Sequence, residues 1–202
     1  MENTNTITEK TKEKILYSNP DQSSSYNNIT VKTPYTWWWV LIMSIIVVGF
    51  GVLFHYTYEW SKENPYVGTF SAINESVWEH LKLLFYPLII AALIQYIFIR
   101  HGNLGAGIFF GAVTGIFLIM ALFYIYVGAF THPNTYVGID ISIFVISSVI
   151  AVIVATWIFS LYSFGFEYNF LSTIGIFLLL FMFITFTFIT PDLPLFIPPN
   201  EE

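Results

Sequence analysis

The chain has 202 residues, of which 56% are apolar, 20% aromatic and only 10% charged. Soluble domains carry about a quarter charged residues, so this composition excludes an ordinary soluble enzyme. Seven Lys and Arg against 13 Asp and Glu exclude nucleic-acid binding on electrostatic grounds, and the lack of Cys excludes disulfides and thiolate metal sites.

Hydropathy divides the chain into a polar N-terminal tail (1–36), a transmembrane domain (37–189) and a Pro-rich tail (190–202). The first segment has no apolar core of a signal peptide and is expected to be flexible. A spanning helix needs about 20 apolar residues. Five stretches provide them: 37–58, 78–99, 104–130, 141–164 and 170–189. We therefore expect an all-α, polytopic transmembrane helix bundle with five spans, followed by a non-helical, extended arm along the membrane surface.

The positive residues predict the orientation of this bundle in the cell membrane. Five lie on the side of the N-terminus, namely Lys10, Lys12, Lys14, Lys32 and Arg100, and two lie on the other side, Lys62 and Lys82. Because Lys and Arg are enriched in cytoplasmic segments, the N-terminus is expected to be cytoplasmic and the C-terminus extracytoplasmic.

Ionisable side chains gather at one membrane face in this arrangement. They come from the end of the first span, the start of the second span and the connection between the third and fourth spans. These residues are His55, Glu59, Glu75, Glu79, His80, Lys82, His132 and Asp140. Placing a charge in the membrane costs about 2.5–3.5 kcal/mol, so such residues are candidates for function. The middles of the spans contain no Asp, Glu, Lys, Arg or His.

The densest group opens the second span. Ser76 and Glu79 have the spacing of a helix capping box, and Asn74 is an alternative cap. If the helix starts early enough, Glu75, Glu79 and Lys82 share one face, and either Lys82 or a divalent cation relieves the repulsion between the carboxylates. The helix macrodipole alone also favours acidic residues here. We assign a binding or structural role to Asn74, Glu75, Trp78, Lys82 and Asp140.

A metal site at this face is the second interpretation. His55 and Glu59 lie four residues apart on one helix, and His132 comes from a separate connection, so these three are candidate ligands of a divalent metal such as zinc. Glu79 and His80 are the candidate catalytic residues of a hydrolytic centre. No zinc signature such as H-E-x-x-H is present, and His55 is also a suitable interfacial anchor.

Gly107, Gly111 and Gly115 repeat every four residues in the third span. Small residues at this spacing let two helices approach closely. Packing within the chain is the preferred interpretation, and the alternative is a dimer interface or a sliding gate.

The run from Asn74 to Pro87 resembles the signature of an uncharacterised family of small bacterial multi-pass membrane proteins, with the motif NES-x-WEH-x-K. The residues His55, Glu59 and Trp60 and the arm from Pro191 to Phe196 also resemble that family. The resemblance covers most of 37–199. It implies a membrane protein and assigns no activity.

Three functions remain open. The first is a non-enzymatic binding or structural membrane module in which Glu79 and Lys82 tie the second helix to its neighbours. The second is a membrane-embedded, metal-dependent hydrolase or transferase that acts on a lipid-like substrate. The third is a small transporter subunit, which the uncharged span interiors disfavour. The partners compatible with such a chain are the lipid bilayer, a second copy and another membrane protein.

Overall fold

The computed structural model describes residues 37–100, 102–129, 136–161 and 164–198, and the predicted N-terminal tail lies outside them. The described residues contain five long helices: α3 (Trp37–Trp60), α5 (Val77–Phe98), α6 (Leu104–Ala129), α7 (Val137–Ser160) and α8 (Phe166–Phe188). All five are long and apolar enough to cross a membrane. In lipid every backbone polar group must be satisfied internally, and an α-helix achieves this within one segment. The expected class, an all-helical bundle with five spans, is confirmed.

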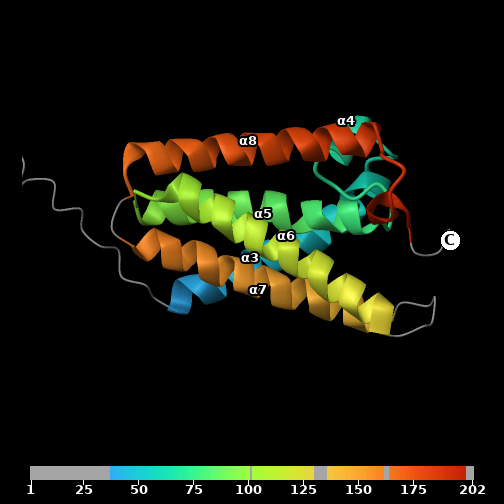
Figure 1. The fold of residues 1–202 in the computed structure, drawn as a ribbon, viewed down its shortest axis with the longest axis horizontal. Helices are drawn as coiled ribbons and strands as arrows, with labels where there is room; N and C mark the ends of the chain where they lie inside the picture. The colour runs from blue at the N-terminus through green and yellow to red at the C-terminus, as the bar shows by residue number, and fades with distance from the viewer. Residues whose placement is uncertain (1–36, 101, 130–135, 162–163, 199–202) are drawn as a thin grey trace, which may run out of the picture. The chain divides into compact units, whose positions relative to one another are not determined.

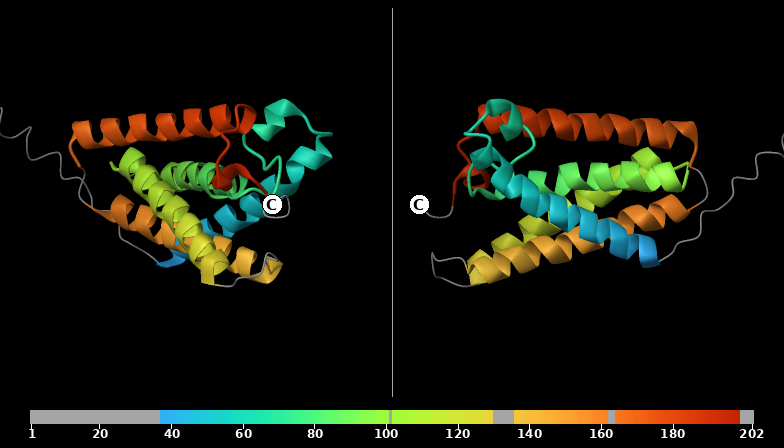
Figure 2. Two further views of the ribbon diagram at one scale, coloured as in Figure 1. Left: turned by 45° about the vertical axis from the view of Figure 1, so that its right-hand side comes forward. Right: turned by 180° about the vertical axis from the view of Figure 1, so that it is seen from behind.

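Helix α5 occupies the interior of the bundle. It lies between α8 on one side and α3 and α7 on the other (Figure 1, Figure 2). Its side chains supply much of the buried core, including Leu81, Leu84, Phe85, Leu88, Ala91 and Ala92. Helix α6 packs most extensively against α7 and also contacts α5 and α8. The polar residues that open α5 are therefore drawn into the centre of the fold.

The three glycines of α6 allow this close packing. A Cβ at Gly107 would collide with the ring of Phe159, and one at Gly111 would lie 2.9 Å from the carbonyl oxygen of Ala151. A Cβ at Gly115 would lie 2.6 Å from Leu84. The glycines thus face α7 and α5, and the interpretation as packing within the chain is the one that the structure supports.

Replacing Gly111 by Leu is expected to lower the free energy of unfolding by about 1–3 kcal/mol because the contact with α7 leaves no room for a side chain. Gly128, on the same helix, has open space at its Cβ position, so Gly128→Leu is the matched control. Thermal unfolding in detergent micelles measures both variants. Equal stability of the two would contradict the packing role.

Two helices begin earlier than expected from the sequence. Helix α7 includes Asp140 in its first turn, and α8 includes Glu167. Hydropathy places each start after the charged residue. The structure places it before, because a carboxylate near a helix N-terminus is stabilised by the macrodipole.

The arm after α8 differs from the predicted extended tail. A 3₁₀ turn, η1 (Pro194–Phe196), folds against α5, and Phe196 is buried. Its ring centroid lies 4.9 Å from that of Trp78. The expectation that this arm is non-helical was wrong for these residues, and the burial of Phe196 in an aromatic cluster holds the turn against α5.

Candidate functional site

Residues 61–76 connect α3 to α5 and fold back onto the last turns of α3. The reversal begins at Lys62 and Glu63, which both have φ of 58°, and continues through the short helix α4 (Pro65–Gly68). Ser71 then docks on α3: its hydroxyl donates to the carbonyl oxygen of Phe54 and accepts from the backbone N–H of Tyr58 at 3.0 Å. This anchoring brings the residues before α5 next to the end of α3.

The first residues of α5 are capped by two neighbouring side chains. Ser76 is the N-cap, and its hydroxyl accepts from the backbone N–H of Glu79 at 3.4 Å. Asn74 accepts from the backbone N–H of Ser76 at 3.0 Å. The Glu79 carboxylate does not complete the predicted capping box and instead accepts from the backbone N–H of Ile73 at 2.9 Å. The sequence predicts Glu75 on the helical face of Glu79 and Lys82 if the helix starts early enough. The helix begins at Val77, so Glu75 precedes it and does not lie on that face.

Glu75 lies between two histidines. Its Oε1 is 3.6 Å from Nε2 of His55, and its Oε2 is 3.5 Å from Nε2 of His80. The three residues offer ligand atoms that all lie within 4.8 Å of one another, and we call them the His–Glu cluster. The cluster is half-buried at the imidazoles and exposed at the carboxylate.

The orientation of His80 is fixed by a hydrogen bond. Its Nδ1 lies 2.9 Å from the carbonyl oxygen of Ser76, which can only accept, so Nδ1 carries the proton. The lone pair of the neutral ring is then on Nε2, which faces Glu75 and His55. A backbone carbonyl that holds the distal N–H is the usual support of a metal-bound histidine.

A pocket of about 400 Å³ opens beside the His–Glu cluster. Its walls come from α3, from the segment before α5 and from the C-terminal arm: His55, Tyr56, Tyr58, Glu59, Ala72, Ile73, Asn74, Glu75 and Pro198. Two members of the cluster, His55 and Glu75, line the pocket. Among the residues that the structure describes, the lining contains two carboxylates and neither Lys nor Arg.

A second polar group lies deeper, between α5, α8 and α4. The Nζ of Lys82 lies 2.6 Å from Oε2 of Glu79 and donates to the Thr187 hydroxyl at 2.9 Å and to the Gly68 carbonyl oxygen at 2.8 Å. Lys82, Glu79 and Thr187 are all buried. Each donor of the ammonium group therefore has an acceptor, as a buried charge requires.

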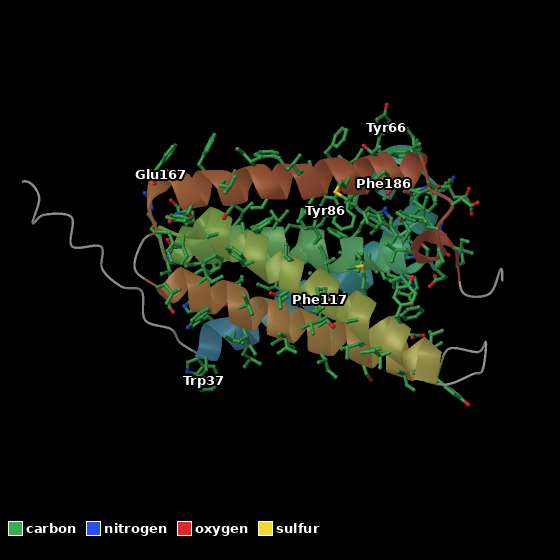
Figure 3. All side chains as sticks on the ribbon, in the orientation of Figure 1. Trp37, Tyr66, Tyr86, Phe117, Glu167 and Phe186 are labelled. Atoms are coloured by element: carbon green, nitrogen blue, oxygen red, sulfur yellow. The ribbon has the colours of Figure 1, made fainter. Side chains whose placement is uncertain are left out.

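Aromatic rings of α5 and α8 pack together near this ion pair. Trp78 packs on Phe183 at a centroid distance of 4.8 Å and on Phe186 at 5.5 Å. Figure 3 shows Tyr86 and Phe186 between α5 and α8, whereas Tyr66 points away from the helices. Trp78 therefore has a packing position rather than a position in the pocket.

The structure divides the predicted catalytic pair. Glu79 belongs to the buried ion pair, and His80 belongs to the His–Glu cluster. Of the predicted ligands, His55 is in the cluster, Glu59 lines the pocket without joining the three-residue group, and His132 lies outside the described residues. Asp140 lies in the first turn of α7 and is not part of the cluster.

The sequence predicted Glu75 beside Glu79 and Lys82, whereas the structure has it between His55 and His80. Sequence reasoning did not find Thr187. Thr187 lies in a span of mostly aromatic and aliphatic residues, which draws no attention to it. The signal that could have found it is the pair of hydroxyl residues, Thr185 and Thr187, in the last turn of a span that ends at the same face as the polar residues.

Comparison with known proteins gives one match. A family model described as a family of unknown function (DUF6512) matches residues 27–199. No curated protein matches the chain, and no solved structure matches it.

Proposed function

The chain belongs to DUF6512, a family of unknown function, and on that premise we propose an activity from its own residues. We propose that it is an integral membrane protein that binds a divalent transition metal ion through His55, Glu75 and His80. The ligand types indicate zinc. The observation that carries the proposal is the convergence of these three side chains from α3, the connecting segment and α5.

The distances within the cluster support one ion held by all three residues. Two ligand atoms bound to a tetrahedral zinc ion at about 2.0–2.1 Å lie about 3.3–3.4 Å from each other. Glu75 lies 3.6 Å from His55 and 3.5 Å from His80. All three ligand atoms lie within 4.8 Å of one another, so side-chain rotations that bring them closer together would close the site.

The ligand types favour zinc over hard cations. Mg²⁺ and Ca²⁺ prefer oxygen ligands, whereas imidazole nitrogen suits zinc and its neighbours among the transition metals. Two histidines and one glutamate also leave a fourth tetrahedral position free. His55 and Glu75 line the pocket, so the free position is expected to face it.

Exposed aromatic residues support a position of the site at the level of a membrane surface. The side chains of Tyr56, Trp60 and Tyr66 are exposed around it, and Trp and Tyr concentrate at the boundary between lipid and water. On the positive-inside count this face is extracytoplasmic, with the protein in the cell membrane and its N-terminus in the cytoplasm.

Replacing Glu75 by Gln is expected to weaken zinc binding more than about 100-fold. Removing a residue that only hydrogen-bonds a metal ligand lowers the affinity about 10–100-fold, and removing a ligand lowers it further. Glu63→Gln, an exposed site in the same connecting segment, is the matched control and should keep the affinity. Competition between the detergent-purified protein and a chromophoric chelator measures both, and gel filtration shows that both are folded. Equal affinities would overturn the proposal.

A further inference from the structure

We propose that the metal centre is hydrolytic: Glu59 acts as general base on a water at the free metal position, and the pocket takes a carboxylic ester or amide whose polar part is neutral or cationic. This inference rests on the proposed metal binding and adds a reaction and a substrate class to it.

Glu59 is the carboxylate that lines the pocket without belonging to the His–Glu cluster. It follows His55 by one helical turn on α3, so the two side chains lie on the same face. It lines the pocket together with His55 and Glu75, yet it is not one of the three converging ligands. Its carboxylate makes no ion pair or hydrogen bond with any described side chain. Glu79, in contrast, is bound to Lys82 and is buried away from the pocket.

The reaction consumes only water. Glu59 removes a proton from the water molecule, and the oxygen of that water bonds to the acyl carbon of the substrate. The bond between the acyl carbon and the leaving oxygen or nitrogen then breaks, and Glu59 returns the proton to the leaving atom. The products are a carboxylic acid and an alcohol or amine, and no oxidant or reductant takes part.

The charge of the pocket selects the substrate class. With a divalent ion bound, the charges of Glu59 and Glu75 offset that of the ion, and the described lining has no Lys or Arg that would bind a further anion such as a phosphate or sulfate group. Tyr56, Tyr58 and Ile73 offer aromatic and aliphatic surface for a hydrocarbon chain. Because the exposed aromatic residues place this pocket at the membrane surface, an amphiphile can enter with its polar end toward the metal.

The test compares zinc content and hydrolysis in the same samples of full-length, detergent-purified protein. The probes are para-nitrophenyl octanoate, octanoyl para-nitroanilide and bis(para-nitrophenyl) phosphate. We expect the zinc-loaded protein to cleave at least one of the acyl probes and not the phosphate. Glu59→Gln should keep its zinc and lose at least about 100-fold in rate, as removal of a general base does. Glu63→Gln should keep both.

The two proposals fail in distinguishable ways. Stoichiometric zinc with no acyl cleavage, or with equal rates in wild type and Glu59→Gln, overturns the hydrolytic inference and leaves the metal site standing. Cleavage of the phosphate in preference to the acyl probes overturns the substrate class. Absence of zinc from the wild-type protein overturns the proposed function and this inference with it.

Discussion

Replacing Lys82 by Met is expected to lower the free energy of unfolding by about 3–5 kcal/mol, because it leaves the Glu79 carboxylate buried without its cation. Glu79 would keep one backbone donor, Ile73 N, and the Thr187 hydroxyl, neither of which carries a charge. Lys62 is exposed in the connecting segment, so Lys62→Met is the control and should change stability little. Unfolding by heat or denaturant in micelles measures the difference.

A double variant separates the loss of a charge partner from the loss of packing. Lys82→Met combined with Glu79→Gln removes both charges and keeps an acceptor for Ile73. It is expected to recover at least half of the lost stability, since neutral replacements of a buried pair are often well tolerated. If the double variant is less stable than Lys82→Met alone, the unpaired charge is not the cause.

Zinc at about 100 times its Kd is expected to raise the free energy of unfolding by about 2.7 kcal/mol, since the ion binds only the folded arrangement of the cluster. His80→Ala should abolish this gain, and Glu63→Gln should keep it. A zinc-dependent shift of equal size in His80→Ala would show that the ion binds elsewhere.

The buried ion pair and the His–Glu cluster are connected through the backbone. The Lys82 ammonium group donates to the carbonyl oxygen of Gly68, and the Glu79 carboxylate accepts from the backbone N–H of Ile73. Both contacts fix the segment that carries Glu75. The prediction that Glu79 and Lys82 tie α5 to its neighbours thus agrees with their geometry. The same contacts position Glu75, a ligand of the proposed metal site.

Much of the fold follows from hydropathy alone. The thickness of the bilayer sets the length of each span, and the alternation of spans and connections assigns each polar segment to one face. For this reason the sequence already groups His55, Glu75 and His80 at one end of the bundle. Hydropathy places a helix start too late where an acidic residue lies in the first turn, as Asp140 does in α7 and Glu167 in α8.

The division of the polar residues into two groups was not predictable from the sequence. It depends on α5 beginning at Val77, two residues after Glu75, and on the docking of Ser71 against α3. Thr187 joins Lys82 across a sequence separation of 105 residues, and no local pattern encodes such a contact. A shift of one residue in the helix start would send Glu75 in another direction.

X-ray absorption at the zinc edge, on the full-length protein purified in detergent and loaded with one zinc ion per chain, tests the metal site most directly. The geometry predicts a shell of nitrogen and oxygen atoms at about 2.0–2.1 Å and the outer-shell scattering of two imidazoles. Both imidazole signals should disappear in a variant with His55→Ala and His80→Ala. A wild-type spectrum of oxygen ligands without imidazole scattering, or one that the double variant leaves unchanged, would contradict a metal site at His55, Glu75 and His80.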